Sequence, residues 1–464
     1  MKVLFITLGC KANQYETNAM EQSFIKSGYD IANDSDVPDI CVVNTCSVTN
    51  IAERKSRQML RRMKELNKKA IVVACGCYSQ VGKDELEKMP EVDIIVGVNE
   101  KNNIVEIVEK YIKQSEKIEE VSDVMHEKEF QDFGTTTYTE LTRAVVKIQD
   151  GCDRFCSYCI IPYARGRVRS RDADSILKEI EAISKQGIKE VVLTGIHIAS
   201  YGKDFTDEKV KEYREKYGYK ADYIKFDPKD DLHTGGFRLI ELLEQIEKVT
   251  DIERIRIGSL EPKLINEEFV KRLANLNKIC EHFHLSLQSG CNETLKRMNR
   301  RYTVEEFEES AKLLRKYFKD VKLTTDIIVG FPGETEEEFN KTCDFLKKIK
   351  FYKMHIFKYS IRKGTVAEKM PNQVDGKLKE ERSKILIELS NKNEEEYNQE
   401  LIGKVVDVLF EERKKEYFEG HTKNYIMVKV KTTENLQNEI KKVKIVRTEN
   451  LETYGKIINW KNST

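Results

Sequence analysis

The chain has 464 residues, of which 39% are hydrophobic and 34% charged, and its net charge at pH 7 is +1. A near-neutral chain gives no overall field to attract nucleic acid, so any such affinity has to come from local charge. No apolar run approaches the ~18–20 residues of a membrane-spanning helix, which excludes a helical membrane protein. The chain contains eleven cysteines and no recognisable signal sequence, which is typical of a reducing cytosol where thiols bind metals. We therefore expect a cytoplasmic protein of about two to four domains.

Residues 1–112 alternate between short apolar runs and stretches with helical signals. Continuous apolar runs of this kind are typical of buried parallel strands, and helices between them indicate an open α/β layer. The sequence therefore predicts an N-terminal parallel α/β domain. Its expected strands are Val3–Leu8, Ile40–Val43, Ala70–Ala74 and Val92–Val96, with helices near 16–27, 52–66 and 82–89.

Three cysteines follow the first three of these strands. Cys10, Cys46 and Cys77 each come directly after an apolar run, so all three should lie at the same edge of one sheet. Thiolates select iron–sulfur clusters, zinc or copper(I). We expect these three thiolates to hold a 4Fe–4S cluster, called the auxiliary cluster below to distinguish it from a second one. Cys41 and Cys75 fall inside their strands, where a packing role is expected.

The predicted helix after Cys46 is strongly basic. Residues 52–69 contain eight basic and two acidic side chains, with Arg61 and Arg62 adjacent. Such a helix is either an ordinary solvated face or a surface that binds RNA phosphates. Residues 113–140 are polar and weakly periodic, and we expect them to form a connector.

From residue 141 to 375 the alternation of strands and helices continues over a longer series. Six strands separated by helices predict an incomplete (β/α)6 barrel, because they are too few for a complete eight-stranded one. The expected strands are Ala144–Ile148, Glu190–Leu193, Arg254–Ile257, His282–Leu287, Lys322–Val329 and Met354–Tyr359. Residues 202–236 form a charged, Tyr-rich excursion with a possible helix at 208–216.

The loop after the first of these strands carries the pattern Cys152-x3-Cys156-x2-Cys159. A 4Fe–4S cluster is normally held by four cysteines, so three close thiolates would leave one iron open. Zinc would need a fourth ligand, and the nearest histidines in sequence are His126 and His197.

This loop, with Tyr158 before its last cysteine, resembles the cluster loop of radical S-adenosylmethionine (SAM) enzymes. The resemblance implies that the open iron chelates the methionine part of SAM and that Tyr158 lies near its adenine. It also implies cofactor contacts from loops that follow later strands. The residues concerned are Gly195, Ser259, Glu261, Gln288 and Gly330.

Two cysteine trios on one chain resemble the methylthiotransferase branch of this family. The stretch from Gly9-Cys10-Lys11 to Thr17 is similar to the enzymes that act on threonylcarbamoyladenosine in tRNA. The resemblance implies two 4Fe–4S clusters, two SAM molecules per turnover, and methylthiolation of adenine C2 at tRNA position 37. It further implies two partners, the tRNA anticodon stem-loop and an electron donor such as flavodoxin or ferredoxin. No side-chain acid or base is indicated.

Arginines stand at every second position beside the second cysteine trio. Arg165, Arg167 and Arg169 would share one face of an extended segment, where we expect them to contact RNA phosphates. The alternative is ion pairing with Asp172 and Asp174.

The C-terminal part begins with a charged connecting helix at 376–400 and continues in short strands. Residues 401–464 resemble the TRAM domain of RNA-modifying enzymes, a small β-barrel, and carry a net charge of +4. Tyr425 is the expected RNA-stacking side chain; a purely structural cap is the alternative. The expected strands are Lys404–Phe410, Tyr425–Val430 and Lys442–Val446, with Gly420 and Gly455 at turns.

Two other functions stay open at this point. The same enzyme class acts on isopentenyladenosine in tRNA or on a ribosomal-protein side chain. A protein of another class, a non-catalytic iron–sulfur RNA-binding protein, would also fit the cysteines and the basic segments.

Overall fold

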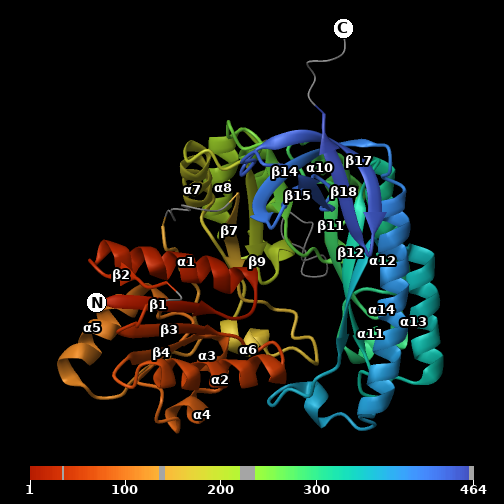
Figure 1. Cartoon of the computed structure of the whole chain (residues 1–464). Helices are drawn as coiled ribbons and strands as arrows, with labels where there is room; N and C mark the ends of the chain where they lie inside the picture. Colours follow the sequence, from red (N-terminus) through yellow and green to blue (C-terminus); the bar gives the residue numbers. More distant parts are fainter. Residues whose placement is uncertain (34–35, 135–141, 220–235, 459–464) are drawn as a thin grey trace.

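The computed structural model describes residues 1–33, 36–134, 142–219 and 236–458. Its strands form a six-stranded sheet, two smaller sheets of four and three strands, and a closed five-stranded barrel (Figure 1). Within the described residues, no helix combines the length and the apolar character needed to cross a membrane. Residues 220–235 of the excursion predicted at 202–236 lie outside the described residues, and its expected helix is α8 (Asp207–Tyr217).

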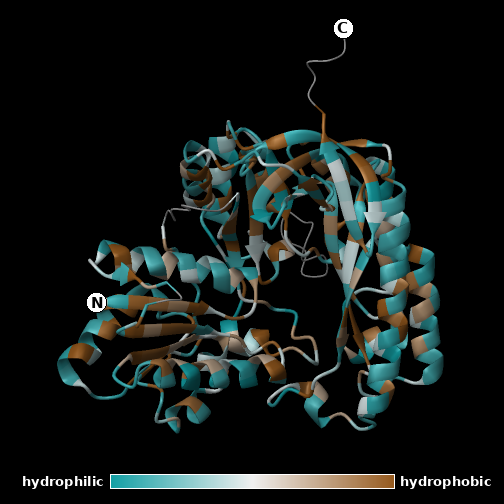
Figure 2. Cartoon of the chain, viewed as in Figure 1, coloured by the Kyte–Doolittle hydropathy of each residue, from teal (hydrophilic) through white to brown (hydrophobic). Residues whose placement is uncertain are grey.

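The N-terminal sheet is parallel throughout, in the order β2-β1-β3-β4-β5-β6. Figure 2 shows its apolar strands between more polar helices, as expected for a sheet buried on both faces. Cys41 and Cys75 are fully buried in its two cores, which confirms their packing role. The strands are β1 Lys2–Thr7, β2 Asp30–Ile31, β3 Ile40–Thr45, β4 Ile71–Gly76, β5 Ile94–Val96 and β6 Ile118–Glu120. The helices are α1 Lys11–Lys26, α2 Asn50–Leu66, α3 Cys77–Val81, α4 Lys83–Glu87 and α5 Ile104–Gln114.

The expected connector at 113–140 differs from prediction because it contains a strand. β6 pairs in parallel with β5 and forms the edge of the first sheet. Only three residues pair there, and only Ile118 is buried, so the apolar signal was too short to predict it. Residues 135–140 of that segment lie outside the described part of the chain.

The central region contains all six predicted parallel strands. β7, β9 and β10 form one sheet, and β11, β12 and β13 form another. Isolated parallel bridges, Ile255 to Ile279 and Leu260 to Leu285, join the two sheets into one incomplete barrel. The short β8 (Arg169–Ser170) adds antiparallel to β7. The six strands are β7 Arg143–Asp150, β9 Glu190–Gly195, β10 Arg254–Ile257, β11 His282–Gln288, β12 Lys322–Val329 and β13 Lys353–Lys358.

Helices accompany this barrel, and all of them except the short α6 contribute buried side chains to a common core. They are α6 Ile161–Arg165, α7 Ala173–Lys185, α9 Leu239–Ile246, α10 Glu267–Ala274, α11 Asn292–Arg297, α12 Val304–Tyr317 and α13 Glu336–Ile349. The predicted connecting helix is α14 (Gly376–Gln399), which packs along β13 (Figure 1).

The C-terminal strands close into a barrel in the order β14-β15-β16-β18-β17. Two strands were missed, and Gly420 and Gly455, expected at turns, lie inside them. A Cβ at Gly420 would come within 2.3 Å of the Leu409 carbonyl oxygen, so glycine here permits close strand contact. The strands are β14 Val405–Lys414, β15 Tyr417–Thr422, β16 Met427–Lys431, β17 Ile440–Glu449 and β18 Glu452–Ile457.

The small barrel is bonded to the incomplete one through two arginines. Arg254 donates to the carbonyl oxygens of His421 at 2.8 Å and Asp407 at 3.0 Å. Arg143 pairs with Glu411 at 2.8 Å. These contacts hold the barrel beside the carboxyl-end loops described next.

Candidate active site

The first cysteine trio gathers at one edge of the N-terminal sheet. Cys10 immediately precedes α1, Cys46 follows β3, and Cys77 begins α3 directly after β4. β1, β3 and β4 are neighbours, so their carboxyl ends bring the three thiols together. Cys10 is exposed, whereas Cys46 and Cys77 are buried.

Gly9 and Asn13 fix the conformation of the loops that carry these cysteines. Gly9 has φ +101°, and a Cβ there would lie 2.8 Å from Cys46 Sγ, so only glycine fits. Asn13 donates from its side-chain nitrogen to the carbonyl oxygens of Leu8 at 2.7 Å and Thr45 at 3.0 Å. That amide therefore ties the Cys10 loop to the Cys46 loop.

A buried arginine connects this edge to the second cysteine loop. Arg165 donates from Nε to Cys77 Sγ at 3.2 Å and from Nη1 to Glu16 at 2.7 Å. Its Nη1 also lies 3.1 Å from Asp150, two residues before Cys152. The prediction that Arg165 and Arg169 contact RNA is wrong, because both are buried and Arg165 is fully occupied by protein groups. The ion pairs expected with Asp172 and Asp174 are also not the ones Arg165 forms.

The charges in this network fix one another's ionisation. Burial alone would raise the pKa of Glu16, but Arg165, Lys101 and Lys147 hold it well below its ordinary value. Asp150 follows the same pattern, since burial is outweighed by Arg165 and Lys147 and its pKa is lowered. The carboxylates stay ionised and paired, which joins α1 of the first domain to the strand β7 that leads into the second loop.

The second trio lies on the loop after β7. Gly151 has φ +68°, and a Cβ there would meet the Arg167 carbonyl oxygen at 1.7 Å. The loop closes through two backbone bonds, from Cys152 N–H to Gly166 O at 3.0 Å and from Cys159 N–H to Cys156 O at 2.9 Å. Burial raises the pKa of the free Cys152 thiol to about 12, so binding a metal cluster there must release a proton.

These cysteines line a cavity of about 160 Å³ that also contains most of the cofactor contacts expected from the sequence. Tyr158, Ser259, Glu261 and Gln288 lie in its wall, together with Arg154, His197 and Arg300, which sequence reasoning did not propose. Gly330 does not line it, and its N–H donates to Glu334 at 3.0 Å, so the cofactor contact expected of Gly330 stays a prediction.

The additional residues form a charged frame around this cavity. Arg300 donates from Nη1 to Cys156 Sγ at 3.2 Å. Glu261 accepts from Arg154 at 2.8 Å and contacts His197, whose other ring nitrogen lies 2.7 Å from Ser200. His197 is thus hydrogen-bonded through both ring nitrogens. Burial would raise the pKa of Glu261, but His197 and Arg154 lower it, so the carboxylate is ionised.

A second cavity, of about 780 Å³, lies between Cys10, the interior of the incomplete barrel and the small barrel. Gly195 lines this cavity rather than the smaller one, and Ser259 borders both. Tyr425 is also in its wall, where it stacks on His282 (ring centroids 4.8 Å apart) and His421 (4.6 Å). Tyr425 therefore lies in a cavity wall between the two barrels, and its contact with RNA stays a prediction.

Some of the predicted RNA-contacting residues do lie on the surface. Arg61 and Arg62 are exposed on α2, with Arg61 3.7 Å from Glu91. Leu66 is exposed as well, so the apolar face of α2 consists of Leu60 and Met63, with Met59 partly buried. Arg167 is half-exposed and packs over the Phe155 ring at 4.8 Å.

The donor chemistry fits two iron–sulfur clusters. Each site offers three thiols, which suit soft metal centres, and each has an arginine N–H on a cysteine sulfur. The ionised Glu261, the Ser259 hydroxyl and the Gln288 amide could meet the polar groups of SAM in the smaller cavity.

Comparisons with known proteins agree with this geometry. Residues 146–346 match the Radical SAM superfamily, and residues 2–97 match an uncharacterized protein family, UPF0004. The solved structure of the radical SAM methyltransferase TsrM from Kitasatospora setae has a similar fold, with TM-score 0.50 at 14% identity over 77% of this chain and 72% of that chain.

Curated relatives match over almost the full length. The threonylcarbamoyladenosine tRNA methylthiotransferases of Bacillus subtilis and Aquifex aeolicus are 38% and 40% identical, over 96% and 92% of this chain and 94% and 96% of theirs. The tRNA-2-methylthio-N(6)-dimethylallyladenosine synthase of Pelotomaculum thermopropionicum is 36% identical over 89% of this chain and 87% of its own. With its two cysteine trios and its incomplete barrel, the chain belongs to the radical SAM tRNA methylthiotransferases, on the branch of the threonylcarbamoyladenosine enzymes.

Proposed function

We propose that this protein methylthiolates C2 of N6-threonylcarbamoyladenosine at position 37 of tRNA. One structural relationship carries the proposal: the cavity with the second cysteine trio and the cavity that contains Cys10 share Ser259 as a wall residue. A substrate base in the larger cavity would then lie between the two cysteine sites. The near full-length identity to two threonylcarbamoyladenosine methylthiotransferases supports this choice of substrate.

The ligand sets follow from the two trios. Cys152, Cys156 and Cys159 hold the SAM-binding cluster, and Cys10, Cys46 and Cys77 hold the auxiliary cluster. When bound, these groups and two SAM molecules supply a 5′-deoxyadenosyl radical that removes hydrogen from C2 and a methylated sulfur that replaces it. The protein's contribution is to orient the groups and to exclude side reactions.

The chain's own residues do this orienting through fixed charges. Glu261, held ionised by His197 and Arg154, presents a carboxylate to the smaller cavity, where it can receive the amino group of SAM. The network of Arg165 with Glu16 and Asp150 fixes the auxiliary edge relative to the second cysteine loop. Because these groups are buried and paired, the two sites keep their separation during turnover.

Both partners of the reaction also contact the outer surface of the protein. An external one-electron donor of the flavodoxin or ferredoxin type reduces the SAM-binding cluster. The anticodon stem-loop of tRNA contacts basic surface side chains, among them Arg61, Arg62 and Arg167. The chain is accordingly divided into five parts. They are an auxiliary-cluster domain at 1–112, a connector at 113–140, a radical SAM core at 141–375, a connecting helix at 376–400 and a TRAM-like barrel at 401–464.

The test is turnover on defined RNA. Anaerobically reconstituted protein, reduced and supplied with SAM, is incubated with tRNA that carries either threonylcarbamoyladenosine or isopentenyladenosine, and nucleosides are analysed by mass spectrometry. We expect the 2-methylthio product from the first RNA only, together with 5′-deoxyadenosine. Product from isopentenyladenosine alone would identify the other branch. Absence of 5′-deoxyadenosine would leave the non-catalytic RNA-binding protein as the better description.

The cysteine assignment has its own control. A Cys10→Ala/Cys46→Ala/Cys77→Ala variant should lose the iron of one cluster and still cleave SAM. A Cys41→Ala/Cys75→Ala variant, altered at buried cysteines of the same sheet, should keep all its iron.

A further inference from the structure

The larger cavity contains one charge that the protein does not neutralise. Three cationic side chains line it, namely Lys11, Arg256 and Lys353. Arg256 binds Glu190 through Nε at 2.7 Å and Nη2 at 3.2 Å, and Lys353 lies 3.0 Å from Glu394. Lys11 forms no ion pair or hydrogen bond with any residue that the structure describes. Its ammonium group is the unmatched charge of this wall.

Lys11 lies next to the first cysteine trio. It is the first residue of α1 and directly follows Cys10, so the ammonium belongs to the same loop as the auxiliary cysteine site. The Lys11 side chain is exposed at the wall of the cavity, so an anionic ligand group that enters the cavity can reach the ammonium and form a charge-assisted hydrogen bond with it.

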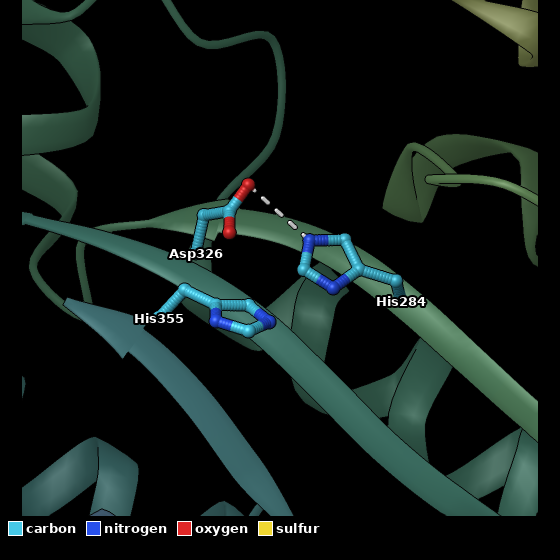
Figure 3. Close-up of side chains that lie close together, drawn as sticks. All are labelled: His284, Asp326 and His355. Carbon is cyan, nitrogen blue, oxygen red and sulfur yellow. Dashed lines mark ion pairs between the residues drawn. The ribbon is translucent and has the colours of Figure 1, made fainter. Parts of the chain in front are cut away.

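Another part of the same cavity is lined by hydrogen-bonding side chains. His284, Asp326 and His355 come from the adjacent strands β11, β12 and β13, and their side chains converge (Figure 3). Asp326 and His355 are register partners, and Asp326 lies 3.3 Å from His284 Nε2. Thr324 Oγ1 is 3.0 Å from His284 Nδ1.

The ligating atoms of these three residues lie within 4.8 Å of one another, a spacing that would also admit a metal ion. Both ring nitrogens of His284 already face protein groups, so this wall is satisfied without one. Its remaining capacity is for hydrogen bonds to a neutral polar ligand, from the free Asp326 oxygen and the His355 ring.

We propose that Lys11 binds the carboxylate of the substrate's threonyl group, while His284, Asp326 and His355 hold the hydroxyl and ureido groups of the same substituent. This inference rests on the proposed function, which brings threonylcarbamoyladenosine into this cavity. Its volume of about 780 Å³ lies within the ~300–1,000 Å³ typical of small-ligand sites. The contact also selects the substrate, because an apolar N6 substituent would bury the Lys11 ammonium without a counter-charge.

The experiment compares two RNA ligands and four proteins. Anticodon stem-loop RNA carries either threonylcarbamoyladenosine or its carboxamide analogue, in which the threonyl carboxylate is replaced by a neutral amide. Their dissociation constants are measured with the reconstituted wild-type holoenzyme and with Lys11→Gln. Lys26→Gln, an exposed lysine at the other end of α1, is the matched control.

We expect the wild type and Lys26→Gln to bind the carboxylate RNA about tenfold or more tightly than the carboxamide RNA, as a charge-assisted contact implies. Lys11→Gln should bind the two RNAs equally. Lys11→Arg, which keeps the charge, should retain a preference for the carboxylate. Retained discrimination in Lys11→Gln, or an equal loss of affinity for both RNAs, overturns the assignment of Lys11.

Further readouts separate this inference from the function it rests on. Iron content and 5′-deoxyadenosine formation report whether Lys11→Gln keeps both clusters, independently of RNA binding. If the wild type binds modified RNA no better than unmodified RNA, the proposed substrate fails and the subsite with it. If a chelator of divalent ions abolishes the carboxylate preference without removing cluster iron, a metal at His284, Asp326 and His355 is the carboxylate ligand and the Lys11 assignment is overturned.

Discussion

Arg165 and Cys77 are 88 residues apart in the chain, yet the Arg165 guanidinium donates a hydrogen bond to the Cys77 sulfur at 3.2 Å. Arg300 has the same relationship to Cys156, also at 3.2 Å. Hydrogen bonds and positive charge at a ligating sulfur favour the reduced state of an iron–sulfur cluster. Each arginine should therefore raise the reduction potential of one cluster.

Replacement of these arginines should change the two potentials separately. Arg165→Lys should lower the potential of the auxiliary cluster, and Arg300→Lys that of the SAM-binding cluster, because lysine keeps the charge but loses the fork geometry of the bond. A redox titration followed by electron paramagnetic resonance measures both. Arg301→Lys, at an exposed neighbour of Arg300, should change neither. Equal shifts of both potentials in either variant would contradict this separation.

Loss of the Arg165 charge should also destabilise the protein. Arg165→Gln leaves Glu16 and Asp150 buried without their arginine, a change that typically costs about 3–5 kcal/mol. We expect a clearly lower thermal unfolding midpoint for Arg165→Gln. The same substitution at the half-exposed Arg167 should leave the midpoint almost unchanged.

Gly9→Ala should prevent assembly of the auxiliary cluster. The added methyl would lie 2.8 Å from Cys46 Sγ, in a backbone conformation of φ +101° that alanine disfavours. Iron content should fall by the iron of one cluster, whereas SAM cleavage persists. Gly28→Ala is the matched control, since Gly28 also has positive φ (+84°) but has open space around its Cα. Full iron content in Gly9→Ala would show that the loop can rearrange around the methyl group.

Stability should fall in acid because of Glu16. Its pKa is held below the ordinary value of 4.5, so its contribution is present above that pH and is lost as pH falls through the folded-state pKa. Each such group changes the free energy of unfolding by up to ~1.4 kcal/mol per pH unit in that window. Glu16→Gln should be less stable at pH 7 and should show a weaker dependence on pH below 4.5, as thermal unfolding of the cluster-free chain can measure. Glu129→Gln, at an exposed site, should reproduce the wild-type pH dependence.

The exposed basic face of α2 should contribute to RNA affinity. Arg61→Gln/Arg62→Gln should weaken tRNA binding and reduce the slope of log K against log salt by ~1–2, if each arginine contacts one phosphate. Filter binding at several salt concentrations measures this slope. Lys384→Gln/Lys392→Gln on exposed positions of α14 is the charge-matched control. An unchanged slope in the α2 variant would assign this face to solvent.

Much of the fold could be predicted because its signals are local. The main strands of the first sheet are continuous apolar runs, those of the incomplete barrel are short apolar or alternating stretches, and Cys10, Cys46 and Cys77 follow their strands closely. Parallel topology then brings those thiols to one edge without any knowledge of packing. β2 and β6 were missed because strands of two and three residues at sheet edges bury too little apolar surface to give a pattern.

The errors concern residues whose role depends on distant partners. Arg165 and Arg169 looked like surface bases because alternation reports only which side chains share a face; their burial depends on Glu16 and Asp150, far away in sequence. Gly420 and Gly455 were predicted to lie in turns because glycine is common there. In the structure they lie inside strands, where the missing side chain allows a neighbouring strand to approach closely. Arg300 carried no local signal, since its partner Cys156 is 144 residues away.

The stacking of Tyr425 on His282 and His421 limits how the small barrel could be exchanged for another domain. Tyr425, Met427 and Leu451 of the small barrel are part of the wall of the cavity that contains Cys10. An RNA-binding module that is merely tethered could be exchanged, duplicated or lost without touching the chemistry. Here its removal would open the cavity that contains Cys10 to solvent, so a graft of the barrel from another protein would have to carry this wall with it.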